Sequence, residues 1–125
     1  MGLEYTIEEE PSLIRVTVRG KIDYLSLDRM WKDIAAACRK HRCTDILGVA
    51  EIEAPTSADA YDHASILAIA GLNSDYRIAW VESNPQSRDT ARLAEAVIRN
   101  RGLATGCMFD NVADARQWLA ESKLS

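Results

Sequence analysis

The sequence predicts a single α/β domain over residues 1–125, in the order ββαβαβαβα, with a mostly parallel sheet and packed helices. The first twenty residues alternate apolar and polar side chains, which is typical of an antiparallel hairpin. Later apolar runs are short and unbroken, as in strands buried on both faces of a parallel sheet. The segments between them repeat apolar residues at spacings of three and four, which indicates helices. A hairpin followed by strand–helix alternation predicts parallel strands joined by right-handed crossovers.

The N-terminal hairpin is the clearest element. Residues 3–8 (LEYTIE) and 14–19 (IRVTVR) each have a period of two, and Glu10-Pro11-Ser12 separates them. Proline suits the second position of a tight turn. Glutamates of the first strand and arginines of the second are expected to pair across the polar face.

A helix over about residues 24–40 follows, capped by Asp23 or Ser26. Its apolar stripe consists of Leu27, Met30, Trp31, Ile34 and Cys38. Residues 45–50 (DILGVA) then form the first strand buried on both faces.

The strand–helix pattern then repeats. A helix over about residues 57–70 ends at Gly71, and residues 76–81 form the next buried strand. Asn84 caps a third helix that starts at Pro85 and closes at Gly102. Residues 103–109 form a short strand, and the last helix starts at Asn111 with apolar residues Val112, Ala115, Trp118 and Leu119.

Composition excludes several classes of protein. The net charge is −4, from 15 basic and 19 acidic residues without a basic run, which disfavours nucleic acid. No apolar stretch reaches the roughly 18 residues that cross a bilayer, so membrane insertion is not expected. The acidic N-terminus does not fit a signal peptide, and three cysteines without CxxC spacing favour a reducing cytoplasm. The Cys38-x-x-His41-x-Cys43 cluster matches no common zinc site, so no metal or cofactor is expected.

Three stretches carry a resemblance to a known family: YTIEEEPSLIRVTVRGKID, YRIAWVESNPQSRDTARLAEAVIRNRG and GCMFDNVADARQWL. Together with the order of elements, they resemble STAS domains, in particular the SpoIIAA-like group of small bacterial proteins of the anti-sigma-factor-antagonist type. The resemblance implies a non-enzymatic, cytoplasmic regulatory domain that acts through protein–protein contact. The three tryptophans and one phenylalanine leave open either a buried aromatic core or a homodimer face.

The resemblance also implies a switch at the start of the second helix. In the family a phosphorylatable serine lies in an Asp-Ser-Ser/Thr-Gly motif, and the equivalent stretch here is Pro55-Thr56-Ser57-Ala58. This chain lacks both the leading aspartate and the glycine of that motif. Thr56-x-x-Asp59 also fits a capping box, which needs no regulation to explain it.

The carboxyl ends of parallel strands share one edge of a sheet, where ligands and partners bind. Residues 20–23, 51–57, 82–87 and 109–111 are expected there. The candidate switch or partner residues on this edge are Thr56, Ser57, Asp59, His63, Glu82 and Asn84. A second candidate is a basic face on the third helix, made of Arg88, Arg92 and Arg99 with Glu95 between them. It fits either an acidic partner or a solvated row of Arg–Glu pairs.

Two other functions stay open. A small-ligand or lipid-binding carrier is the alternative, and an apolar pocket above about 300 Å³ would favour it. Alanines on the helices (Ala64, Ala91, Ala94) instead predict close packing and little cavity. A hydrolase would use Asp59 and His63, which are one helical turn apart, with nearby glutamates. A histidine at the surface or its boundary, paired with Asp59, is the simpler interpretation.

Overall fold

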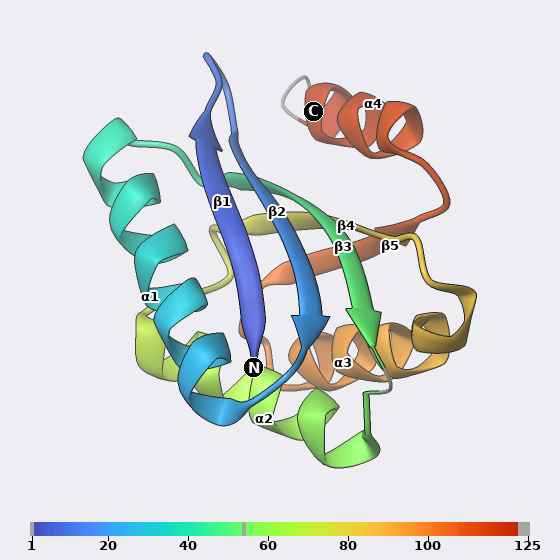
Figure 1. The fold of residues 1–125 in the computed structure, drawn as a ribbon. Coiled ribbons are helices and arrows are strands. Elements are labelled where there is room, and N and C mark those ends of the chain that lie inside the picture. Colours follow the sequence, from blue (N-terminus) through green and yellow to red (C-terminus); the bar gives the residue numbers. More distant parts are fainter. Residues whose placement is uncertain (1, 54, 123–125) are drawn as a thin grey trace.

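A computed structural model describes residues 2–53 and 55–122, with the backbone alone at Ser57 and Ser122. Its five strands form one sheet in the order β1-β2-β3-β4-β5 (Figure 1). The first pair is antiparallel and all the others are parallel, as the sequence predicts. The strands are β1 (Leu3–Glu9), β2 (Ile14–Lys21), β3 (Asp45–Glu53), β4 (Arg77–Glu82) and β5 (Thr105–Phe109).

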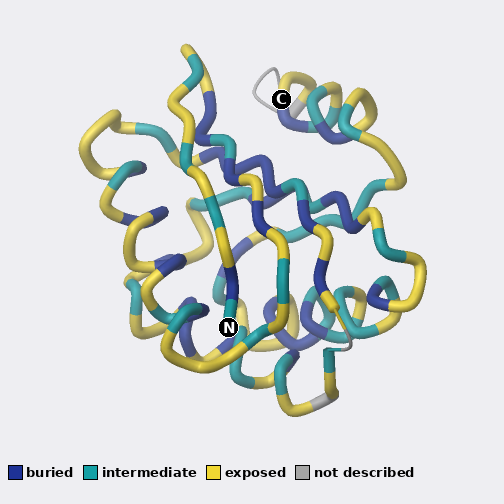
Figure 2. Tube along the Cα trace, in the orientation of Figure 1, coloured by how far each residue is buried: buried dark blue, intermediate teal, exposed yellow. Residues whose placement is uncertain are grey.

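Helices cover the two faces of the sheet unequally. Three helices pack on one face around the larger apolar core, and α4 packs alone on the other face over a smaller core (Figure 1). The helices are α1 (Tyr24–His41), α2 (Ser57–Ala70), α3 (Arg88–Asn100) and α4 (Val112–Ser122). In Figure 2 the inward faces of the helices and the central strands are dark blue, which marks them as buried.

Most local predictions are confirmed. The hairpin register places Glu4 opposite Arg19, whose side chains pair at 3.3 Å on the solvent side. Asp23 is the cap of α1, because its carboxylate accepts the N–H of Ser26 at 2.8 Å. Gly71 ends α2 in the left-handed conformation, at φ 92°. Each of these features depends on residues that are close in sequence or in register.

Two predicted boundaries are wrong. Asn84 does cap a turn, but residues Pro85–Ser87 form a 3₁₀ helix and α3 begins only at Arg88. The last strand starts at Thr105 instead of residue 103, because the N–H of Leu103 donates to the Ile98 carbonyl and closes the end of α3.

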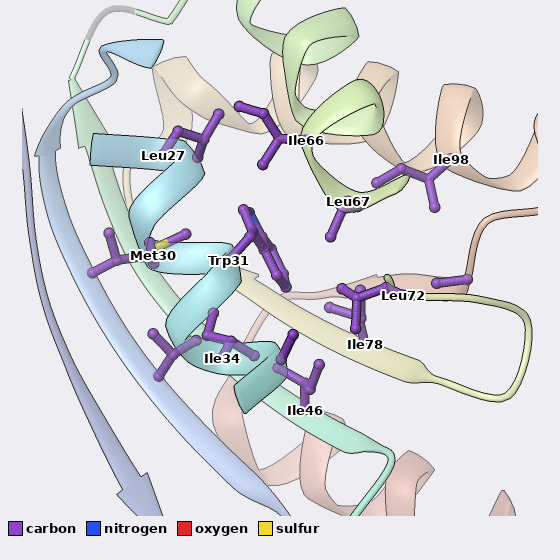
Figure 3. Packing of buried hydrophobic residues seen from close by; sticks show 14 of the residues in the cluster. Leu27, Met30, Trp31, Ile34, Ile46, Ile66, Leu67, Leu72, Ile78 and Ile98 are labelled. Carbon is purple, nitrogen blue, oxygen red and sulfur yellow. The ribbon is translucent and has the colours of Figure 1, made fainter. Parts of the chain in front are cut away.

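Aromatic packing joins α1 to the sheet. Trp31 of α1 is buried against Ile66 and Leu67 of α2 (Figure 3). Its ring stacks with that of Trp80, with 6.1 Å between the ring centroids. Trp80 lies against Gly48 of the neighbouring strand, where a Cβ atom would be 2.2 Å from the indole. Only a glycine at position 48 therefore leaves room for the indole of Trp80.

A buried ion pair stabilises the face that α4 covers. Arg77 donates twice to the Asp45 carboxylate, at 2.9 and 2.6 Å, and once to the Leu119 carbonyl of α4 at 3.2 Å. Asp45 is only 2% exposed. The pair thus joins β3, β4 and the last helix.

Candidate functional site

The strands β2 to β5 end at one edge of the sheet, which we call the strand-end edge and define by residues 20–25, 51–53, 55–62, 82–87 and 109–111. In Figure 1 the arrowheads of β2 and β3 point to the same end of the molecule, beside the starts of α1 and α2. Helices α1, α2 and α4 and the 3₁₀ turn before α3 each begin within four residues of a strand end. The strands therefore end together as predicted, and the edge as defined here also takes in the first turns of α1 and α2, beyond the predicted residues 20–23 and 51–57.

At the start of α2, Thr56 and Asp59 form a capping box. Asp59 Oδ2 accepts the N–H of Thr56 at 2.7 Å, and Thr56 Oγ1 accepts the N–H of Asp59 at 3.3 Å. Thr56 is exposed, and the side chain of Ser57 lies outside the described residues. The cap alone accounts for the hydroxyl at position 56.

Glu82 and Asn84 face inward instead of lining an open edge. Glu82 is 1% exposed, and its Oε2 accepts the N–H groups of Ile52 and Asn84, both at 3.1 Å. Burial raises the pKa of Glu82, and those two N–H groups oppose the shift. The amide of Asn84 donates to the Ile52 carbonyl at 2.8 Å. Both side chains tie β3 to β4, because backbone groups at strand ends need partners. The prediction that they belong to an accessible surface is wrong for Glu82.

Ser87 also forms a hydrogen bond with the end of β3. It is buried, and its hydroxyl donates to the same Ile52 carbonyl that accepts from Asn84. Ser87 lies in the predicted 82–87 stretch, but a serine in a helical turn carries no sequence signal of burial.

His63 is turned into the core and does not form the expected surface pair with Asp59. The indole Nε1–H of Trp31 donates to His63 Nε2 at 2.6 Å, and the imidazole also meets Trp80 edge-on at 6.1 Å. Desolvation lowers the pKa of His63 to about 4, and the nearby charge of Asp59 opposes this. Its acceptor nitrogen is occupied and weakly basic, so His63 is poorly suited to act as a general base near neutral pH.

A cavity of about 70 Å³ lies beside His63. Its walls come from α2, α3 and the last three strands, and they include Ala60, Leu67, Trp80, Ala91, Ala94 and Ile98. Of the three alanines predicted to pack closely, Ala91 and Ala94 line this space, whereas Ala64 is fully buried and does not. The volume is still well below the roughly 300 Å³ of ordinary ligand pockets, so the carrier stays the alternative.

The row of arginines on α3 is partly used by the fold. Arg88 Nε donates to the Glu82 carbonyl at 3.2 Å, and Arg99 pairs with Glu95 one turn before it. Glu95 also accepts the N–H of Met108 at 2.8 Å, on the outer edge of β5. The hollow beside Arg88 and Arg92 is lined as well by Asp110 and Asp114, so its charge is mixed.

The Cys38, His41 and Cys43 cluster does not assemble. Burial raises the pKa of the Cys38 thiol to about 12, and His41 Nε2 instead lies 2.7 Å from Glu9 Oε2. Within residues 2–53 and 55–122 no group of three or more His, Cys, Asp or Glu side chains is placed to hold a metal ion. Across the same residues, no helix is both long and apolar enough to cross a membrane.

Large apolar side chains are exposed at the starts of two helices. Among the described residues, four such side chains are exposed, and three of them lie on the strand-end edge: Tyr24 (48%), Leu25 (76%) and Tyr61 (48%). The fourth, Ile69, is at the far end of α2. The start of α1 is largely yellow, hence exposed, in Figure 2. Between Arg42 and Arg77 the sequence has six acidic residues and neither lysine nor arginine, so α2 and its approach are anionic.

Solved structures of two proteins have the same arrangement of strands and helices. An anti-sigma factor antagonist from Mycobacterium paratuberculosis is 14% identical, with a TM-score of 0.65 over 95% of each chain. An uncharacterised protein with a SpoIIAA-like fold from Shewanella loihica is 16% identical, with a TM-score of 0.59 over 94% of each chain. The chain has the SpoIIAA-like fold. No family model and no curated protein matches the sequence. The SpoIIAA-like fold that the sequence resembles is confirmed, and at these identities the likeness shows the fold alone.

Proposed function

We propose that this chain is a non-enzymatic regulatory domain that binds a basic protein partner through the strand-end edge. The observation that carries the proposal is the exposure of Tyr24, Leu25 and Tyr61 at the starts of α1 and α2. Single exposed apolar residues are ordinary, but several on one edge are typical of an interaction surface. Tyrosine is also enriched in protein interfaces. The similarity of the fold to that of an anti-sigma factor antagonist supports a regulatory role.

The charge of the edge indicates the chemistry of the partner. Glu51, Glu53, Asp59 and Asp62 lie within six residues of the start of α2 in the sequence, and no basic residue lies among them. Complementary charge speeds association and rejects partners of like charge. We therefore expect the partner to present lysine or arginine around an apolar centre, and its binding to weaken as salt screens the exposed charges.

Phosphorylation at the start of α2 is the proposed means of regulation. The N-terminus of a helix favours a phosphate, whereas the four carboxylates around it oppose one. Since Thr56 already serves as the cap, Ser57 is the residue that we assign as the switch. A phosphate there would make the edge more acidic and change its affinity for a basic partner.

Affinity capture from the native host tests the surface. Leu25→Ser and Tyr61→Ser should lose a partner that wild type retains, whereas Ile69→Ser removes an equally exposed apolar side chain elsewhere on α2 and should keep it. Raising the salt from about 50 to 500 mM should weaken the captured complex. Identical partners from all four proteins would rule out this edge. Ser57→Asp, tested alongside, should alter the partner set, and an unchanged set would leave the surface without the switch.

A further inference from the structure

The cavity beside His63 has the properties of a small binding site. It borders the strand-end edge, because Asp59 and Glu82 contribute to its lining, and it continues inward to Trp80 and the alanines of α3. We propose that it takes a small neutral molecule with a hydroxyl or carbonyl oxygen, which accepts a hydrogen bond from His63 Nδ1–H. The molecule would lie between α2, α3 and the sheet, against the ring of Trp80. This goes beyond the proposed function, because it concerns a ligand and not the protein partner.

The hydrogen bond from Trp31 fixes which nitrogen of His63 carries the proton. An indole nitrogen can only donate, so His63 Nε2 is the acceptor and the neutral imidazole has its proton on Nδ1. Within the described part of the chain, Nδ1 has no hydrogen-bond partner, although His63 lines the cavity. Among the described residues only Arg15 Nε and Arg77 Nη1 are buried polar atoms without a partner, so Nδ1 is accessible and its N–H is free to donate to an oxygen of a bound molecule.

The size of the cavity limits the ligand. About 10–15 Å³ of such volume holds one water molecule, so 70 Å³ corresponds to roughly five to seven non-hydrogen atoms. A lipid or nucleotide is far larger. A short-chain alcohol or ketone has the right number of atoms, and the apolar walls match its carbon chain.

The charged groups of the walls select against ions. Asp59, Glu82 and Glu95 contribute to the lining, and none of the lining residues is lysine or arginine. A carboxylate or phosphate ligand would meet like charge and find no cation. An alkyl ammonium would be attracted by the carboxylates, but it has no lone pair that could accept a hydrogen bond from His63 Nδ1–H. A neutral oxygen compound satisfies both conditions.

Titration of the ¹⁵N-labelled protein with 2-pentanone and with 1-pentanol, followed by NMR, tests the proposal. Both should shift the indole N–H signal of Trp31 saturably, with a Kd of about 1 mM, in the range open to six-atom ligands. Pentanoate and pentylammonium should bind at least tenfold more weakly. The proposal is overturned if neither neutral probe gives a saturable shift, or if pentanoate binds as tightly as 2-pentanone.

Filling the cavity locates the site. Ala91→Leu adds three carbons to its wall and should abolish the saturable shift, and Ala94→Val is a smaller change at the same place. Ala120→Leu on the exposed side of α4 makes the same replacement away from the cavity and should bind like wild type. Unchanged binding in folded Ala91→Leu or Ala94→Val would also overturn the proposal. Partner capture has its own readout, so either proposal can fail alone.

Discussion

Replacing His63 by glutamine isolates the pH dependence that burial of the imidazole imposes on folding. The carbonyl of glutamine still accepts a hydrogen bond from Trp31, but the side chain no longer titrates. Desolvation lowers the pKa of His63 from 6.5 to about 4 in the folded protein. The unfolded chain therefore binds more protons than the folded protein between these two values. The contribution of neutral His63 to the free energy of unfolding is therefore fully present above about pH 6.5 and is lost as the pH falls towards 4.

The size of the effect follows from the two pKa values. Relative to His63→Gln, the free energy of unfolding of wild type should fall by about 1 kcal/mol at pH 5.5. It should fall by about 2–3 kcal/mol at pH 4.5 and hardly at all at pH 7.5. Urea unfolding of both proteins at these pH values, followed by tryptophan fluorescence, measures the difference directly.

Other titrating groups do not obscure this comparison. The raised pKa of Glu82 acts in the opposite sense, since a carboxyl that is protonated more readily when folded favours the folded state at low pH. Glu82 is present in both proteins, so its contribution largely cancels in the difference. Parallel stability curves for wild type and His63→Gln between pH 7.5 and 4.5 would refute the buried, neutral state of His63.

Three further predictions concern stability, measured as the free energy of unfolding in urea. Thr56→Ala should cost about 1 kcal/mol by removing the cap of α2, and Thr56→Ser should restore most of it; equal losses in both would exclude the cap. Gly48→Ala should cost about 1–3 kcal/mol because its Cβ would clash with the indole on the next strand, whereas Gly106→Ala, with nothing within 4 Å, should be nearly neutral. A similar cost at both glycines would contradict the clash. Asp45→Ala should cost about 3–5 kcal/mol because it leaves the charge of Arg77 buried without its carboxylate; a loss below 1 kcal/mol would show that solvent reaches the pair.

The sequence predicts much of the fold because its signals are local. Alternation over residues 3–8 and 14–19 indicates the hairpin, and the apolar stripe of α1 is buried throughout. The capping residues Asp23 and Thr56 act on N–H groups three residues later, so their role is visible in a short window. The strand-end edge follows from the order of elements, because parallel strands must end together.

The side-chain contacts inside the candidate site could not be predicted from the sequence in this way. His63 meets Trp31, which is 32 residues away, and Glu82 bonds to the N–H of Ile52, 30 residues away. The spacing of apolar residues predicts which side of a helix faces the sheet. It does not predict whether a side chain at the boundary of that side points to solvent or forms a hydrogen bond inside the protein. For His63 the indole of Trp31 decides this, because a buried N–H needs an acceptor.

From its own residues the chain determines the order of strands and helices, their caps and the edge at which the strands end, since these depend on neighbours along the chain. Only the tertiary structure determines that Glu82 is buried, that His63 is neutral beside a small cavity, and that Tyr24, Leu25 and Tyr61 remain outside. The physical reason is that burial and pKa depend on which distant groups exclude water from a side chain, and spacing along the sequence does not contain that information.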